Sequence, residues 1–512
     1  MPVSRSILHP VGLSICLLTL ASSPVMASTP VPLSASDMAW LRRDGFDLDA
    51  ASVARYRAMG RAGLLDAQLA DRINEPLPPS IDALIRSYPV LATSTESSLF
   101  ALKQQQQQVN AMPDGDAKVD AKKALQQQAN ALGDQAREIV MLRAVYGPNQ
   151  LKEQMVWFWL NHFSINLGKG RVRWVAADYE ENVIRPHALG KFKDLVMATL
   201  KSPAMLEYLD NAQNAQGKVN ENYARELMEL HTLGVDSGYT QQDVQQLALI
   251  LTGAGLIPLD GRDQRFPPRI ESLVVRDGLF QFNPKRHDFS DKRLLGQPIH
   301  GRGFDEITEA VELITRQKAC AQFISRKLAQ YFVADNPPQA LVERMTNTFQ
   351  RSDGDIAQVM RTMFESRELL QTAGTKFKDP TQFVVSSVRL AYDGKPLANA
   401  QPMINWLNQL GEPVFGRITP DGWPLDASGW SSSGQMSKRF EIARIIGRGD
   451  NRLFTPEGSP KQGVGFPMIT TRLFYDAFAP HLSVATKAAL DQAGSQQEWN
   501  LFLLSSPDFN SR

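Results

Sequence analysis

Residues 150–166 constrain the fold most, because they are predicted to form a helix with apolar side chains on nearly every face. The centre of this helix reads Met155-Val156-Trp157-Phe158-Trp159-Leu160. A helix that is apolar all round belongs in the interior of a large protein. His162 follows Met155 and Phe158 at helical spacings of seven and four, so we expect its imidazole to lie among apolar neighbours.

Amphipathic helical patterns cover most of the remaining chain, which predicts an all-α fold. An irregular segment, 257–303, interrupts them with repeated prolines and short alternating runs that predict a small β-hairpin near 272–282. Residues 97–145 predict a long helical hairpin, since two runs rich in Gln and Ala flank a Pro-Asp-Gly break. A loop of Gly, Pro, Ser and Trp follows at 411–436. We therefore predict one large helical domain over residues 28–512.

Residues 1–27 have the three parts of a secretory signal peptide. Arg5 is the basic part, residues 11–21 are apolar, and Val25-Met26-Ala27 is a cleavage site of the small-x-small type. The apolar run is too short to cross a bilayer comfortably. We therefore expect a periplasmic or secreted protein that is cleaved between Ala27 and Ser28.

The overall charge excludes several classes of partner. The formal net charge is +1 at pH 7, and loss of Arg5 with the signal peptide leaves the charges balanced. This balance does not favour nucleic acid or an anionic membrane surface as a partner. No other apolar run is long enough to span a bilayer. Cys320 is the single cysteine after cleavage, so we expect no disulfide within the chain.

Residues 220–253 hold the densest set of ionisable side chains, and they predict two helices joined by a turn at Gly234. In the first helix His231 faces the apolar side, while Glu226 and Glu229 lie on the opposite side. On a straight α-helix, Glu226 and His231 are roughly 140° apart. We therefore expect that these two side chains do not bind the same ion.

The chain resembles the bacterial family called domain of unknown function 1800. The resemblance rests on 220–253 and on four further segments, WFWLNHF (157–163), SPAMLEYLDNAQN (202–214), FNPKRHDFSDKRLLG (282–296) and RKLAQYFVADNPP (326–338). It covers nearly all of the chain after the signal peptide. The family has no agreed activity, but its members are typically exported and often accompany a second exported family, domain of unknown function 1501. The resemblance therefore implies a location and an exported partner protein, and it implies no mechanism.

A transition-metal site is the first chemical alternative, because imidazole and carboxylate groups together bind Zn, Mn or Fe. His162, His231 and His287 are the candidate ligands of a divalent ion. Neither His-Glu-x-x-His nor Glu-x-x-His is present, so the ligands have to come from separate elements. The competing interpretation is that His162 and His231 are core histidines that form hydrogen bonds with their neighbours.

Acid–base catalysis without a metal is the second alternative. Glu226 or Glu229 would act as the base, with His287 or Asp288 as its partner across a cleft. Their separation does not follow from the sequence. Cys320 lies in a helix among small residues, which indicates a structural thiol rather than a nucleophile.

A calcium site is the third alternative, because the loop before residue 220 and the start of the helix offer oxygen ligands. The candidate ligands are Asp210, Asn211, Asn214 and Glu221. Their spacing matches no EF-hand loop, and the same residue types are typical of turns and helix caps.

A binding or assembly role is the alternative of a different class. Trp423 and Trp430 in the 411–436 loop would stack on sugar rings or contact a partner, unless they pack back onto the core. A periplasmic scaffold that uses this loop and the 97–145 hairpin needs no catalytic motif.

These two classes predict different structures. An enzyme site requires three segments to converge on one cleft, namely 157–163, 220–231 and 282–292. A scaffold predicts that these segments lie apart, each with ordinary packing partners.

Overall fold

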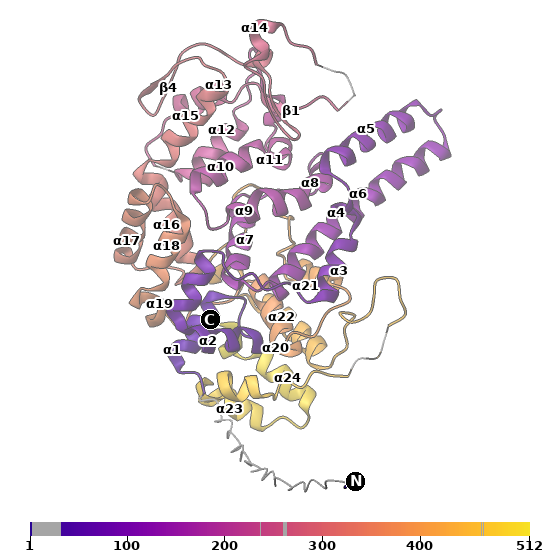
Figure 1. Ribbon diagram of the computed structural model, residues 1–512, viewed down its shortest axis with the longest axis vertical. Coiled ribbons are helices and arrows are strands. Elements are labelled where there is room, and N and C mark those ends of the chain that lie inside the picture. The colour runs from indigo at the N-terminus through magenta and orange to yellow at the C-terminus, as the bar shows by residue number, and fades with distance from the viewer. Residues whose placement is uncertain (3–31, 236, 260–263, 462, 464) are drawn as a thin grey trace.

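The computed structural model, drawn as a ribbon in Figure 1, describes residues 1–2, 32–235, 237–259, 264–461, 463 and 465–512. It is 62% helical and 4% strand, which confirms the predicted all-α class. Apart from residues 1 and 2, the predicted signal peptide lies outside the described residues. Among the helices that the structure describes, none is both long and apolar enough to cross a membrane.

The N-terminal helices lead into the predicted helical hairpin. The helices before it are α1 (Ala35–Asp44), α2 (Ala50–Leu69), α3 (Pro79–Ser87) and α4 (Pro89–Ala92). The hairpin consists of α5 (Thr95–Ala111) and α6 (Asp116–Tyr146), and its tip projects from the body of the molecule in Figure 1. The helical hairpin predicted for 97–145 is therefore confirmed.

Helix α7 (Gln150–His162) lies in the interior, as its apolar sequence predicts. The side chains of Met155 and Trp159 are completely buried. They belong to one continuous cluster of buried apolar side chains that extends along the chain from Leu33 to Phe509. The remainder of the fold positions other elements around this helix.

The elements that follow α7 include two of π type. They are α8 (Val172–Asp178), η1 (Tyr179–Ile184), α9 (Arg185–His187), α10 (Phe192–Lys201), α11 (Pro203–Tyr208), η2 (Asn211–Gln213), α12 (Asn222–Glu226), η3 (Leu227–Thr232) and α13 (Gln241–Ile250). The 220–253 stretch thus forms two helices with Gly234 in the turn, but the first one changes from α to π. The N–H of Leu233 donates to the carbonyl of Met228, five residues earlier, at 2.9 Å. The straight-helix angle between Glu226 and His231 therefore does not apply.

Short antiparallel strands occupy the irregular segment. They are β1 (Ala254–Leu256), β2 (Val275–Asp277), β3 (Phe280–Phe282), β4 (Lys292–Leu294) and β5 (Gln297–Ile299), with α14 (Pro268–Glu271) and η4 (Pro284–Arg286) between them. Strands β2 and β3 form the predicted hairpin, in which Val275 lies opposite Phe282. Strand β1 adds to the other edge of β3, and β4 pairs with β5 in a second sheet that was not predicted.

The second half of the chain is helical again. Its elements are α15 (Phe304–Thr315), α16 (Lys318–Phe332), α17 (Gln339–Arg351), α18 (Ile356–Phe364), α19 (Arg367–Gln371), α20 (Pro380–Tyr392), α21 (Gln401–Gln409), η5 (Ala427–Gly429), α22 (Ser433–Gly447), η6 (Phe474–Phe478), η7 (Ala479–His481), α23 (Val484–Asp491), α24 (Gln496–Ser505) and α25 (Pro507–Asn510). Helix α16 contacts η3. The predicted 411–436 loop ends at Ser432, because residues 433–436 form the first turn of α22. Two hydrogen bonds of His162, the last residue of α7, join α7 to η3 and to α16.

Candidate functional site

His162 is the last residue of α7, and its ring contacts two other elements. Nε2 lies 2.9 Å from the carbonyl oxygen of His231, and Nδ1 lies 3.0 Å from Nζ of Lys327. Because a carbonyl oxygen can only accept, Nε2 carries the proton and the Nδ1 lone pair accepts from the lysine. Burial, together with the charge of Lys327, holds the pKa of His162 well below its usual range, so the ring is neutral.

Lys327 of α16 is the cation of this cluster, and its side chain is half-buried. Nζ lies 5.4 Å from the centre of the Phe323 ring. In the part of the chain that the structure describes, its hydrogen-bond partner is His162, and no carboxylate is within ion-pair distance. Burial lowers the pKa of Lys327 to about 8, and the charge of Asp421 partly opposes this shift. A lysine in this state exchanges protons near neutral pH, which is the property of a catalytic lysine.

His231 lies in η3 with its ring fully buried. The ring centre is 6.0 Å from that of His162 and 5.0 Å from that of Phe163. Neither ring nitrogen has a hydrogen-bond partner among the described residues. Burial, followed by the charge of Lys327, lowers the pKa of His231 to about 3, so this ring is also neutral. Unpaired buried nitrogens are costly and indicate either a functional constraint or a small bound species.

The two glutamates predicted as catalytic come from the segment that also carries His231, Glu226 from the end of α12 and Glu229 from η3. Glu226 is half-buried and forms no hydrogen bond or ion pair with any residue that the structure describes. Burial raises the pKa of Glu226, and the charge of Glu229 raises it further. Glu229 lies 3.5 Å from Arg225 and forms an ordinary ion pair with it. Because its pKa is raised, Glu226 is better able to hold a proton than an ordinary glutamate.

Asp421 is a third carboxylate of the site and comes from the 411–436 loop. Burial raises its pKa, but hydrogen bonds from Arg417 and Thr419 outweigh this effect, so the pKa is lowered and the group is ionised. Its charge acts on both Lys327 and Glu226. The loop thus supplies negative charge to a site whose other members come from α7, α12, η3 and α16.

Asn161 holds this loop against the end of α7. Its Oδ1 accepts from the N–H of Trp423 at 2.5 Å, and its Nδ2 donates to the carbonyl of Trp423 at 3.1 Å. Trp423 is half-buried and Trp430 is buried, and their ring centres are 6.3 Å apart. The two tryptophans therefore pack back onto the protein, which was one of the two interpretations of the sequence.

His287 belongs to a different network. Its Nδ1 lies 2.8 Å from the carbonyl oxygen of Thr252, and its Nε2 lies 2.9 Å from Oε1 of Glu306. The other oxygen of Glu306 lies 2.6 Å from Nζ of Lys292. Asp288 accepts from the N–H of Ser290 at 2.9 Å in the adjoining turn. Both nitrogens of His287 are occupied, which is the arrangement of a structural histidine.

Of the three segments that were expected to converge in an enzyme site, 157–163 and 220–231 meet through His162 and His231. The third, 282–292, contributes no contact to that cluster through His287, whose ring nitrogens contact Thr252 and Glu306. Two of the three predicted metal ligands are therefore together. Within the described ranges, no group of three or more His, Cys, Asp or Glu side chains is arranged to hold a metal ion. The metal site remains a prediction that rests on the unpaired nitrogens of His231.

The residues proposed for calcium serve the turn before α12. The amide of Asn211 donates to Ala254 at 3.0 Å, and that of Asn214 donates to Ala248 at 2.9 Å. Asp210 forms an ion pair with Lys169 at 2.9 Å. These contacts stabilise the turn, as expected from the interpretation that these residue types are typical of turns and helix caps.

Lys327 is the site residue that the sequence interpretation missed, although a signal was present. Cys320, Ile324 and Tyr331 are buried on one face of α16, and Lys327 falls on the same face at helical spacing. A lysine within an apolar stripe is unusual, because lysine side chains are mostly exposed. The sequence does not show which residue pairs with Lys327, because His162 is 165 positions away along the chain.

The fold and site together define a large helical protein with a lysine–histidine cluster at the junction of three elements. The chain belongs to the family described as "Protein of unknown function (DUF1800)", whose model matches residues 39–511. This confirms the resemblance that the sequence motifs indicated. None of the curated proteins and none of the solved structures compared with the chain matches it. Its function is therefore argued from the site.

Proposed function

We propose that this protein is an exported enzyme that performs acid–base catalysis with Lys327, Glu226 and His162. The observation that carries the proposal is the hydrogen bond between Lys327 and neutral His162 in a place where no described carboxylate pairs with the lysine. Export is inferred from the predicted signal peptide and from the family resemblance. The reaction class is proton transfer to and from a substrate, as in an elimination or an isomerisation.

Two other lysines of the protein show how a buried ammonium is normally accommodated. Lys292 pairs with Glu306 at 2.6 Å, and Lys378 pairs with Asp47 at 2.6 Å. Removing a charge from water is expensive unless an opposite charge compensates. Lys327 differs from both, because its side chain is half-buried and has no such carboxylate among the described residues. This arrangement leaves the amine accessible and lowers its pKa, which fits a group that takes part in chemistry.

The three side chains have different roles in this proposal. With a pKa of about 8, about one tenth of Lys327 is a free amine at neutral pH. His162 accepts one N–H of that amine and so directs its lone pair away from the ring; it is a positioning residue. Glu226, whose pKa is raised, returns a proton to the substrate. A base and an acid with pKa values displaced toward each other are characteristic of acid–base sites.

The protonation of Lys327 is measurable without a substrate. Competitive acetylation across about pH 6 to pH 10, followed by mass spectrometry, gives the pKa of each lysine. Lys327 should titrate near pH 8, well below the value of about 10.4 that is ordinary for a lysine. If Lys327 titrates at the ordinary value, the site has no free amine at neutral pH and the proposal is wrong.

Catalysis itself is tested by screening elimination and isomerisation substrates with the mature protein. Any turnover should disappear in Lys327→Met and fall about 100-fold or more in Glu226→Gln, the usual contribution of a general acid or base. Lys318→Met and Glu343→Gln are the matched controls on exposed helix faces and should retain activity. Full turnover in Lys327→Met would exclude the lysine from the reaction.

A metal-dependent enzyme is the second candidate, favoured by the two unpaired nitrogens of buried His231. A divalent transition metal would satisfy one of them. Elemental analysis of protein purified from periplasm, without a chelator or a histidine tag, should then find about one equivalent per chain. The metal should be lost in His231→Ala and kept in His187→Ala, because His187 is outside the cluster. Metal-free folded protein removes this candidate.

A periplasmic scaffold is the alternative of a different class, favoured by the projecting hairpin α5–α6 in Figure 1. The partner implied by the family resemblance is an exported protein of the domain of unknown function 1501 family. Co-purification of that partner with the wild-type protein, and its loss when residues 104–124 are replaced by a short Gly-Ser linker, would support the scaffold. Retention of the partner by Lys327→Met would show that binding and the proposed chemistry are separate.

A further inference from the structure

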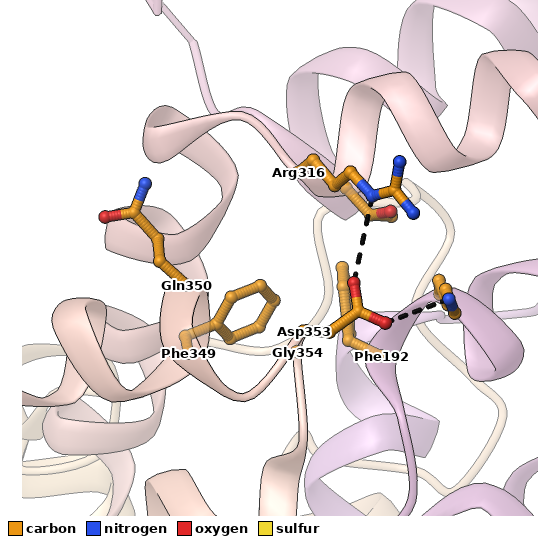
Figure 2. Close-up of a pocket in the computed structure, with 8 residues that line it drawn as sticks. Phe192, Arg316, Phe349, Gln350, Asp353 and Gly354 are labelled. Carbon is orange, nitrogen blue, oxygen red and sulfur yellow. Dashed lines mark hydrogen bonds and ion pairs between the residues drawn. The ribbon is translucent and has the colours of Figure 1, made fainter.

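A cavity of about 300 Å³ lies where three helices meet, and Figure 2 shows the side chains around it. Phe192 and Lys193 come from the start of α10, Arg316 from the end of α15, and Phe349 from α17. This volume is at the lower end of those of small-molecule sites. The cavity is separate from the lysine–histidine cluster, but the ring centre of Phe192 is 6.5 Å from that of His162.

The inner end of the cavity is apolar. The rings of Phe192 and Phe349 meet edge to face with their centres 5.8 Å apart. Gly354 completes this end, with φ at 72°, and a Cβ atom there would lie 3.3 Å from Phe349 and 3.4 Å from Phe192. The absence of a side chain at 354 therefore keeps the space beside the two rings open.

The rim carries one carboxylate and two cations with unequal partners. Asp353 is satisfied, because its Oδ2 lies 2.9 Å from Nζ of Lys193. Arg316 has no close partner of this kind. Its Nε lies 3.8 Å from Asp353 and its Nη2 lies 3.5 Å from Glu312. Both distances exceed the 2.7–2.9 Å that are typical of charge-assisted hydrogen bonds. In Figure 2 the terminal nitrogens of Arg316 lie beyond Nε as seen from Asp353.

Among the residues that line the cavity, two cations, Lys193 and Arg316, stand against one carboxylate, Asp353, so the lining itself carries a positive charge. The hydrogen bond from Lys193 lowers the pKa of Asp353, and the charges of Lys193, Lys191 and Arg316 lower it further, so three cations act on this one carboxylate. The side chain of Arg316 is 61% exposed and can turn toward the cavity at little cost. A planar guanidinium that lacks close partners is suited to a bidentate pair with a carboxylate.

We propose that this cavity binds a small monocarboxylate with an apolar body. The carboxylate pairs with the guanidinium of Arg316, and the apolar body extends toward Phe349 and Phe192. The proposal does not depend on the lysine–histidine chemistry, since none of its residues belongs to that cluster. Phenylacetate, hexanoate and cyclohexanecarboxylate are suitable probes, because each combines one carboxylate with a body of one ring or one short chain.

Isothermal titration of the mature protein with the three probes tests the proposal. At least one acid should bind, and its neutral amide should bind about tenfold more weakly or worse, because the amide has no charge for Arg316. Arg316→Gln should weaken binding of the acid by about tenfold or more. Arg344→Gln is the control, since Arg344 is an exposed arginine of α17 that pairs with Glu368 at 2.7 Å, and it should leave the affinity unchanged.

The outcomes that overturn the proposal are distinct. Failure of all three acids to bind removes the site, and equal affinity for an acid and its amide removes the role of charge. Unchanged binding in Arg316→Gln places the ligand elsewhere on the protein. Thermal unfolding of Arg316→Gln serves as the check that the variant is folded, so that loss of binding is attributed to the missing guanidinium.

Discussion

Lys327 donates a hydrogen bond to Nδ1 of His162 at 3.0 Å, while Nε2 of the same ring donates to the carbonyl of His231 at 2.9 Å. The two contacts span 165 and 69 positions of the chain. They exist only when α7, η3 and α16 are packed together. The lowered pKa of Lys327 is therefore a property of the folded state, which makes it visible in the stability of the protein.

The free energy of unfolding should rise with pH because the pKa of Lys327 is lower in the folded protein than in the unfolded chain. The pKa is about 8 in the folded protein and about 10.4 in the unfolded chain, so the unfolded chain binds more protons in this window. The unfavourable burial of the charged amine is fully present below about pH 8 and is relieved as pH rises toward about 10.4. Urea unfolding of wild type and Lys327→Met across this range measures the difference.

The stability of wild type relative to Lys327→Met should increase across that window. Subtracting the variant removes the contributions of other lysines, including Lys378, whose pKa is lowered to about 7 by burial. Lys318→Met is the control and should differ from wild type by a constant amount. A constant difference for Lys327→Met would mean that the amine titrates alike in both states.

Replacing His231 by leucine should stabilise the protein. The substitution removes two buried nitrogens without partners, each of which costs about 1–3 kcal/mol when unsatisfied. Urea unfolding at neutral pH measures the change. His481→Leu is the matched control, because Nε2 of His481 is 2.8 Å from the carbonyl of Leu33 and its loss should destabilise. If His231→Leu is destabilising as well, a water or an ion binds this ring in the native protein.

Much of the fold follows from sequence periodicity. Helix α7 was predictable because apolar residues on every face leave it no position but the interior, and the α5–α6 hairpin because a Pro-Asp-Gly break separates two long runs. Strands β4 and β5 were not predictable, because three residues each are too few to show an alternation of apolar and polar side chains. The π-helix η3 was also missed, because an i→i+5 hydrogen bond depends on tertiary packing that a fixed helical angle does not contain.

The site was predictable only in part, and for a physical reason. The apolar surroundings of His162 and His231 follow from helix faces, so their burial was expected from the sequence. The partners of His162 and His287 were not expected, because Lys327 and Glu306 come from helices that spacing does not relate to the histidines. Imidazoles with similar sequence surroundings thus have different roles, and the difference lies in the groups that tertiary structure brings to the ring nitrogens.

Glu306→Gln should strongly destabilise the protein. Glu306 and Lys292 are both completely buried at 2.6 Å, and the substitution leaves the lysine charge without compensation. Breaking a buried ion pair from one side costs about 3–5 kcal/mol. Urea unfolding should show this loss, and adding Lys292→Met should restore part of it. Glu309→Gln removes an exposed ion pair with Arg302 and should change stability by about 1 kcal/mol or less. Equal effects of the two glutamine variants would contradict a compensated buried charge.

Gly422→Ala should displace the loop that carries Asp421. Gly422 has φ at 77°, where an L side chain is strained, and a Cβ atom there would overlap the backbone oxygen of Asn161. An alanine at such a position costs more than about 1 kcal/mol. Gly434→Ala is the matched control in α22, because no atom lies within 4 Å of its Cβ position and φ is not positive.

The electrostatic consequence distinguishes a moved loop from a general loss of stability. Asp421 raises the pKa of Lys327, so withdrawing it should lower that pKa further below about 8. Competitive acetylation should therefore show Lys327 reacting at lower pH in Gly422→Ala than in wild type. Asp421→Asn removes the same charge without moving the backbone and should shift Lys327 in the same direction. If Gly422→Ala unfolds more easily yet leaves the titration of Lys327 unaltered, the loop holds the fold without acting on the site.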